Sequence, residues 1–424
     1  MRTSRKPLLI SGLAIGVAGV VALAATAFSG GDSSADKSAR TAATGTGTST
    51  STTGTSTTGT PSGSAPDGAA SGSTSPAAPP SATDSTPAQG ATPGGPDSTG
   101  AYASDGVTPL SQFPSLARVD DALPAGERTV TTIDARYQRA AATAVSSHPD
   151  SGMVVLRPST GAILAMASQG LPYLAYSAER APGSTFKVIT AADLLRNGLT
   201  ESSPAPCVAV DKNGIHNDTP DLVNAKATLA WAFAHSCNTS FTGQLGVLSD
   251  SPLSKEASTY FGLNQKWDLG LGPQTYGTET DAQVPPATDG TFAREMIGQG
   301  GITVSPLIMA SVAATVEAGT FHQPYLVPGT KPTATARALD SGVARQLRDM
   351  MRQTVTDGTA ASLRGVPGVA AKTGTAETGT ANNDSWMIAY QPSSDVAVAC
   401  LVEGGGHGDD EAGPEIAAMF GALK

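Results

Sequence analysis

The sequence predicts an α+β fold: one β-sheet with a helical subdomain inserted between its strands. Strand-like apolar runs occur in two groups, at residues 153–166 and 369–402, and the segments between these groups are mostly helical. Strands, a long helical insertion and then strands again are typical of one sheet built from both ends of a domain.

The first predicted elements are a helix and a hairpin. The helix spans residues 131–145, is rich in alanine and is opened by Thr132 and Asp134. Residues 153–156 and 162–166 are apolar runs joined by Pro-Ser-Thr-Gly, which indicates a β-hairpin.

The elements after the hairpin begin with a buried helix that opens near residue 181 and that Gly198 can close. Near the C-terminus, the apolar patterning predicts three strands and then a short closing helix with Pro414 in its first turn. These strands cover residues 369–375, 385–390 and 396–402, and the helix covers residues 414–424.

Residues 1–29 predict a membrane anchor. Arg2, Arg5 and Lys6 precede an uncharged, mostly apolar stretch at residues 7–28, which as a helix can cross a hydrocarbon core of about 30 Å. The basic residues on its N-terminal side place the following chain outside the cytoplasm, as a single-pass membrane protein. Ala-Thr-Ala at residues 25–27 also fits a cleaved signal peptide, and the protein would then be secreted.

Residues 30–106 predict a disordered, low-complexity linker. Ser, Thr, Gly, Ala, Pro and Asp make up almost all of it, so burial of apolar surface cannot offset the chain entropy. From residue 107 to residue 424 the composition is that of a folded domain. We therefore expect an anchor, a linker and one domain.

The charge and the cysteines argue against several classes of ligand. The formal net charge is −10, and no basic stripe is available to neutralise phosphates, so we expect no nucleic-acid partner. The three cysteines show no C-x-x-C spacing and no run of histidines, which argues against a metal site, and we expect no cofactor. His407 to Glu411 fits an exposed acidic turn better than a metal site.

Ser184 and Lys187 are a candidate nucleophile and base. They lie three residues apart at the start of the buried helix, so both side chains lie on one helix face. An unpaired ammonium group is costly to bury, and burial lowers the pKa of a lysine. The neutral amine can then accept the proton of the serine hydroxyl. Ser-x-x-Lys alone is a weak signal, since Ser34 and Lys37 match it within the linker.

Two further motifs accompany this pair. Ser236 and Asn238 follow a strongly helical run; the hydroxyl can relay a proton, and the amide can hold a substrate carbonyl. The sequence Lys372-Thr373-Gly374-Thr375 lies on a predicted strand. Its cation and hydroxyls suit a substrate carboxylate, and Gly374 lets a substrate backbone lie against the strand.

The three motifs, in this order, resemble those of penicillin-binding proteins, in particular the class B-type transpeptidase domains. Further matches are residues 158–166, Gly298-Gln299-Gly300 with Ser305-Pro306-Leu307, and Trp386. The resemblance implies a β-lactamase/transpeptidase-like antiparallel sheet flanked by helices, with an inserted all-helical subdomain.

The resemblance also implies a reaction. Ser184 would be acylated by the D-Ala-D-Ala end of a peptidoglycan stem peptide, or by a β-lactam that mimics it. Lys187 would be the base, with Ser236 and Lys372 shuttling the proton.

The resemblance implies binding residues as well. Asn238 would orient the substrate amide, and Thr373 and Thr375 would bind the carboxylate. The backbone N–H groups of Ser184 and Thr375 would form the oxyanion hole.

Two alternatives to a D,D-transpeptidase stay open. One is a hydrolase of the same superfamily, a D,D-carboxypeptidase or a β-lactamase, although no Glu-x-x-x-Asn pattern lies between Asn238 and Lys372. The other is a β-lactam or muropeptide sensor, for which only about seven residues precede the apolar stretch.

Cys207 and Cys237 are candidates for a disulfide, since both flank the predicted active-site helices and the predicted compartment is oxidising. The alternative is two small buried side chains. Cys400 lies within an apolar strand, where we expect it to be part of the core.

Overall fold

The computed structural model describes residues 99–248, 252–271, 283–286, 290–380 and 382–424. The chain divides into two units, residues 1–86 and 87–424, and every described residue lies in the second. The predicted anchor and most of the predicted linker lie outside the described residues. Within the described ranges, no helix is both long enough and apolar enough to span a membrane.

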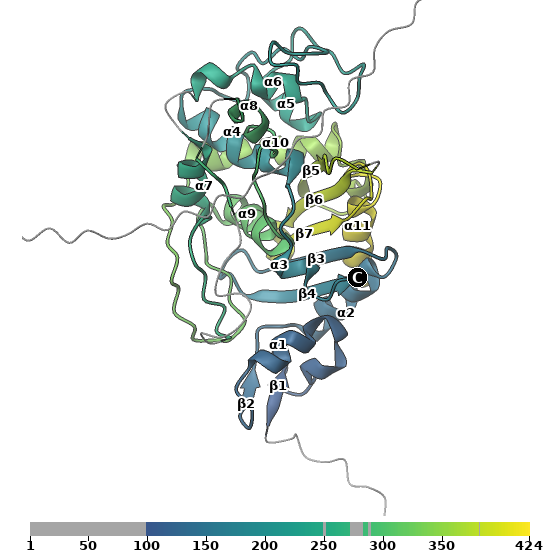
Figure 1. Ribbon diagram of the computed structural model, residues 1–424. Coiled ribbons are helices and arrows are strands. Elements are labelled where there is room, and N and C mark those ends of the chain that lie inside the picture. The colour runs from purple at the N-terminus through teal and green to yellow at the C-terminus, as the bar shows by residue number, and fades with distance from the viewer. Residues whose placement is uncertain (1–98, 249–251, 272–282, 287–289, 381) are drawn as a thin grey trace, which may run out of the picture. The chain divides into compact units, whose positions relative to one another are not determined.

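The main sheet has five antiparallel strands in the order β4-β3-β7-β6-β5 (Figure 1). β3 and β7 pair along their length, with Val154 opposite Ala399, so the two ends of the domain complete one sheet as predicted. The strands are β3 (Ser151–Leu156), β4 (Ile163–Gln169), β5 (Ala370–Ala376), β6 (Asp384–Gln391) and β7 (Val396–Val402).

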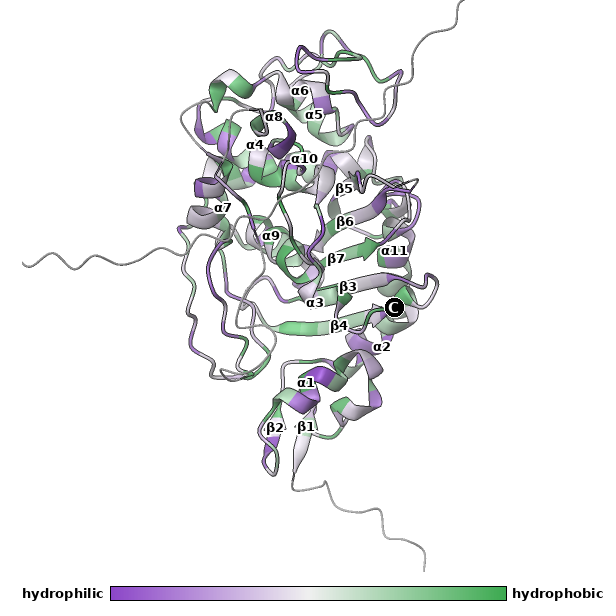
Figure 2. Cartoon of the chain, in the orientation of Figure 1, coloured by the Kyte–Doolittle hydropathy of each residue, from purple (hydrophilic) through white to green (hydrophobic). Residues whose placement is uncertain are grey.

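Both faces of the sheet are covered, which explains why its strands are continuous apolar runs. In β3 every residue is buried: Met153 and Val155 belong to one core, and Val154 and Leu156 to the other. The first core lies against helices α2 (Ala135–Val145) and α11 (Ala412–Ala422), and the second against α9 (Pro306–Ala318). Figure 2 shows the hydrophobic colour concentrated on α9 and the neighbouring strands.

Helix α2 begins at Ala135, later than predicted. The Asp134 carboxylate accepts hydrogen bonds from the backbone N–H groups of Arg136 and Tyr137, which makes Asp134 the N-cap. Residues 131–133 are not helical, and Thr131 donates its backbone N–H to the Tyr102 carbonyl.

The folded part also begins earlier than residue 107. Strand β1 (Gly100–Tyr102) pairs in parallel with β2 (Arg128–Val130), and Ala101, Tyr102 and Ala103 are buried. A strand of three residues made of Gly, Ala and Tyr has nearly the composition of the linker, so composition alone placed the boundary too late.

Among the described residues, the regular elements of the insertion between β4 and β5 are all helices, but residues 199–228 contain no helix or strand. This segment is rich in Asn, Asp, Pro and Gly, which favour turns, so the expectation of an all-helical subdomain was too strong. The helices are α3 (Leu174–Ser177), α4 (Lys187–Arg196), α5 (Leu229–Ala234), α6 (Asn238–Thr242), α7 (Leu253–Phe261), α8 (Phe292–Glu295), α9 and α10 (Ser341–Thr356); helix α1 (Ala117–Ala122) precedes the sheet.

Candidate active site

Ser184 lies on a tight turn next to the sheet. Residues Gly183–Phe186 form a 3-10 helix that leads directly into α4, where a single α-helix was predicted. Gly183 has a φ of 51°, and a Cβ there would collide with the Thr375 carbonyl of β5. Glycine therefore allows the start of the Ser184 turn to lie directly against β5.

Lys187 is fully buried and contacts three oxygen atoms. Its Nζ lies 2.9 Å from Ser184 Oγ, and it donates to the Ser236 carbonyl at 2.7 Å and to Asn238 Oδ1 at 2.6 Å. Two of these partners are obligate acceptors, and the third is the hydroxyl of the candidate nucleophile.

The pKa of Lys187 is lowered to about 7 by burial, against an opposing effect of the Asp218 carboxylate. A neutral amine has two N–H bonds and one lone pair. The two N–H bonds match the Ser236 carbonyl and Asn238 Oδ1, so the lone pair remains for the hydroxyl hydrogen of Ser184. The arrangement is that of a general base beside its nucleophile.

Ser236 connects the two lysines of the site. Its carbonyl accepts from Lys187, and its Oγ accepts from Lys372 Nζ at 2.9 Å. Ser236 has a φ of 58°, a left-handed conformation that is uncommon for a residue with a side chain. This backbone conformation lets one residue present its carbonyl to one amine and its hydroxyl to the other.

Lys372 is fully buried on β5, where its Nζ also donates to the Thr373 carbonyl at 2.9 Å. Burial, and secondly the charge of Lys187, hold the pKa of Lys372 well below its usual value. A cation available to a substrate carboxylate was expected from the strand motif alone. The structure instead places this amine within the hydrogen-bond network behind the nucleophile.

Asn238 was expected to hold a substrate amide. In the structure its Oδ1 accepts from Lys187, and its Nδ2 donates to the His216 carbonyl at 2.9 Å and to Asp218 Oδ1 at 3.0 Å. Both N–H bonds of the amide are thus used within the protein, and the side chain positions the base.

Gly374 is required by the protein's own packing. A Cβ at this residue would lie 2.8 Å from the Pro182 carbonyl, 2.8 Å from Thr185 Cγ2 and 3.0 Å from Trp386 Cβ. The structure shows that this glycine makes room for the Ser184 turn. Its role beside a substrate backbone stays a prediction.

A cleft of about 210 Å³ lies beside these residues. Thr373 and Thr375 line it, with Thr373 Oγ1 2.5 Å from Thr359 Oγ1 and Thr375 Oγ1 3.3 Å from His407 Nδ1. The two predicted carboxylate-binding hydroxyls therefore face the same space. The full lining is Asp218, Thr219, Leu222, His235, Ser236, Thr359, Thr373, Thr375 and residues 407–410.

Several residues of the cleft were not identified from sequence. Residues 407–410 were assigned only to an acidic turn, yet His407 and Asp409 line the cleft and Asp409 accepts from Ser362 Oγ at 2.5 Å. Asp218 and Thr359 lie in segments with no recognisable motif, so only tertiary structure places them here. Among the described residues, no group of three His, Cys, Asp or Glu side chains could hold a metal ion.

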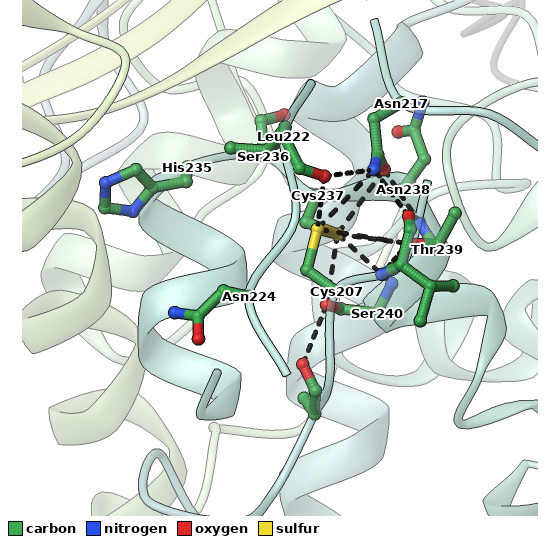
Figure 3. Close-up of a disulfide and its surroundings, with 12 residues drawn as sticks. Cys207, Asn217, Leu222, Asn224, His235, Ser236, Cys237, Asn238, Thr239 and Ser240 are labelled. Carbon is green, nitrogen blue, oxygen red and sulfur yellow. Dashed lines mark hydrogen bonds between the residues drawn. A yellow bond between two sulfur atoms is a disulfide. The ribbon is translucent and has the colours of Figure 1, made fainter. Parts of the chain in front are cut away.

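Cys207 and Cys237 are joined by a disulfide, with an S–S distance of 2.12 Å. Cys237 lies between Ser236 and Asn238, so the bond ties residues 199–228 to this motif (Figure 3). Cys400 is buried and unbridged, in the core as expected.

This fold and geometry define a serine enzyme whose nucleophile is paired with a buried lysine. Residues 151–421 match the family model of the penicillin-binding protein transpeptidase domain, which covers more than half of the chain. The chain belongs to this family.

Relatives of the chain agree with this assignment. The chain is 32% identical to the peptidoglycan D,D-transpeptidase PbpA of Mycolicibacterium smegmatis, over 70% of this chain and 72% of that protein. It is also similar to the crystal structure of PBPA from Mycobacterium tuberculosis, with 30% identity, a TM-score of 0.61 and coverage of 77% of this chain and 90% of that chain. The imipenem acyl-enzyme complex of the M. tuberculosis protein has 29% identity, a TM-score of 0.60 and coverage of 77% and 89%.

Proposed function

We propose that the chain is a serine-type peptidoglycan D,D-transpeptidase that forms an acyl-enzyme at Ser184. The observation that carries the proposal is the buried Lys187 amine, 2.9 Å from Ser184 Oγ, with its two N–H donors directed at carbonyl oxygens. The relatives named D,D-transpeptidase, and the acyl-enzyme complex of a similar structure, support the same reaction.

Acylation in this site would begin with a proton moving from Ser184 Oγ to Lys187 Nζ. The Oγ then forms a bond to the carbonyl carbon of the penultimate D-Ala, and the carbon–nitrogen bond to the terminal D-Ala breaks. The departing amine takes its proton through Ser236 Oγ, which lies 2.9 Å from Lys372 Nζ. A β-lactam would acylate Ser184 in the same way, but its amine would stay attached to the adduct.

Substrate binding is assigned to the two threonines that line the cleft and to backbone donors beside Ser184 Oγ. Thr373 and Thr375 would bind the terminal carboxylate, and the backbone N–H groups of Ser184 and Thr375 would stabilise the oxyanion. Removing one oxyanion donor typically costs about 3–4 kcal/mol of transition-state stabilisation. The deacylating group is then an amine from a second stem peptide.

Product analysis tests this function. The domain is incubated with a synthetic D-Ala-D-Ala stem peptide and a peptide that carries a free amine. We expect D-Ala release together with a cross-linked dimer, and neither product from the Ser184→Ala variant. If D-Ala is released and the only other product is the hydrolysed stem peptide, which lacks its terminal D-Ala, the chain is a carboxypeptidase. If neither the wild type nor the variant releases D-Ala, the proposed function is wrong.

We also propose that the domain acts outside the cytoplasm, on a single-pass anchor formed by residues 7–28. The basic residues before this apolar stretch support the orientation, and the Cys207–Cys237 disulfide suits an oxidising compartment. Protease added to intact spheroplasts should digest the domain, and a carbonate wash should leave undigested protein in the membrane. Recovery of protease-resistant protein in the cytosol would contradict this location.

A further inference from the structure

Asn238 supplies the shortest contact of the Lys187 amine, but an amide can turn end for end. Its oxygen faces Lys187 only while its nitrogen has acceptors on the opposite side. The structure provides two such acceptors, the His216 carbonyl and the Asp218 carboxylate. The backbone carbonyl is fixed by the chain itself, so among the described residues Asp218 is the side chain that orients this amide from the side opposite Lys187.

We propose that Asp218 is a positioning residue for acylation: its carboxylate fixes the Asn238 amide, and Asn238 in turn holds the Lys187 amine against Ser184. This inference rests on the proposed acyl-transfer function. It deepens that function by adding a residue from the irregular segment at 199–228, outside all three sequence motifs.

The segment that carries Asp218 is fastened to the active site before this residue, and it is held together by hydrogen bonds within the segment. The Cys207–Cys237 disulfide ties its first part to the motif of Ser236 and Asn238. Asn217, next to Asp218, is buried and donates to the carbonyls of Val208 and Leu222 at 2.8 and 2.9 Å. These bonds hold the carboxylate in place before substrate binds, as preorganisation of a catalytic group requires.

Asn217 also connects the segment to helix α6. Its Oδ1 accepts from the backbone N–H of Thr239 at 3.2 Å, and Thr239 Oγ1 donates to the Val208 carbonyl at 2.7 Å. The helix that begins with Asn238 and the segment that carries Asp218 are thus locked together around the amide (Figure 3).

The charge of Asp218 acts on the lysines as well. The charged groups that face Lys187 are Asp218 and, from β5, Lys372. Asp218 raises the pKa of both lysines, whereas burial lowers them. Asp218→Asn keeps an oxygen that accepts from Asn238 but removes the charge, and Asp218→Ala removes both the acceptor and the charge.

The two effects can be separated by measuring acylation with a fluorescent penicillin between pH 5 and pH 9. Asp218→Ala should lower the plateau rate constant by at least tenfold, on the order of the loss from a misplaced catalytic group. Asp218→Asn should keep the plateau rate constant within about threefold of the wild type. The rise of the rate constant with pH should shift by about 0.5 pH unit to lower pH, since the charge that raises the pKa of Lys187 is gone. Asp221→Asn, an exposed carboxylate on the same segment, is the matched control and should behave as the wild type.

The inference is overturned if Asp218→Ala shows the same dependence of the acylation rate constant on pH as the wild type. It is also overturned if Asp218→Ala and Asp218→Asn lose the same activity and have a lowered Tm, while the rate constant rises over the same pH range as in the wild type. The residue would then act only on folding. Failure of the proposed function is distinct: the wild type would not be labelled, or the Ser184→Ala variant would be.

Discussion

At the scale of single residues, the site depends on two lysines that are buried without an ion-pair partner among the described residues. Lys187 and Lys372 are both fully buried, and their amines lie 5.4 Å from the ring centre of Phe241 and 5.6 Å from that of Phe233. An isolated ammonium is expensive to bury, so each amine gives up its proton more readily than in water. A pKa near 7 is well matched to general-base catalysis at neutral pH.

The rate of acylation should therefore depend on the protonation of Lys187. The amine is a base only when neutral, so the rate constant for acylation by a penicillin should rise with pH through about 7 and then level off. Lys187→Arg should lower the plateau by about 10²–10⁴-fold, because a guanidinium does not release its proton. Lys331→Arg, at an exposed position, should leave the rate unchanged. Wild-type acylation by the Lys187→Arg variant would contradict the role of the base.

The motif residues could be predicted from sequence because their chemistry and order are informative, but their partners could not. Asn238 and Gly374 were both assigned to substrate, and the structure adds contacts within the protein that the motifs did not indicate: Asn238 accepts from Lys187, and Gly374 makes room for the Ser184 turn. Asp218 was not predicted at all. Its partner Asn238 is twenty residues away along an irregular segment, where no periodicity relates position in the chain to position in space.

At the scale of elements, helices α4 and α7 enclose a pair of buried carboxyl groups. Glu256 on α7 is 3% exposed and Asp193 on α4 is 1% exposed, so neither can be stabilised by water. Arg196 donates to Glu256 at 3.1 Å. Even so, burial and then the charge of Asp193 raise the pKa of Glu256 to about 8. The folded protein therefore keeps a proton here that the unfolded chain releases.

Glu256→Gln should consequently change how stability depends on pH. The pKa of Glu256 is higher in the folded protein than in the unfolded chain. The free energy of unfolding of the wild type should therefore fall by on the order of 2–4 kcal/mol as the pH rises from about 5 to 8. The variant cannot ionise, so its Tm relative to the wild type should increase over this range. Glu127→Gln, at an exposed site, is the control. Parallel curves of Tm against pH for Glu256→Gln and the wild type would show that the carboxyl group is not protonated in the fold.

The elements that the sequence predicted well are those whose apolar pattern is set by burial. β7 matches its predicted bounds, and the other four strands of the main sheet differ from theirs by at most three residues at either end. β1 and β2 were missed because three residues carry too little pattern. The 3-10 turn at Ser184 was predicted as α-helix, since its geometry is set by contact with β5 and not by local sequence.

At the scale of the whole domain, the active site is assembled from parts that are distant in the chain. Ser184 and Lys187 open the insertion, Ser236 lies within it, and Lys372 comes from β5 at its far end. The sheet closes around this insertion through the pairing of β3 with β7, which joins residues about 250 positions apart. The layout of strands around an insertion was predictable from apolar patterning, but the convergence of the three motifs required the fold.

The most direct test of the account is to locate the acyl group on the protein. The domain is incubated with a penicillin, digested and mapped by mass spectrometry. One penicillin should be attached, at Ser184, and the Ser184→Ala variant should carry none while keeping the wild-type Tm. Attachment at another residue, or labelling that survives the Ser184→Ala substitution, would contradict the central claim that Lys187 activates Ser184 as the nucleophile.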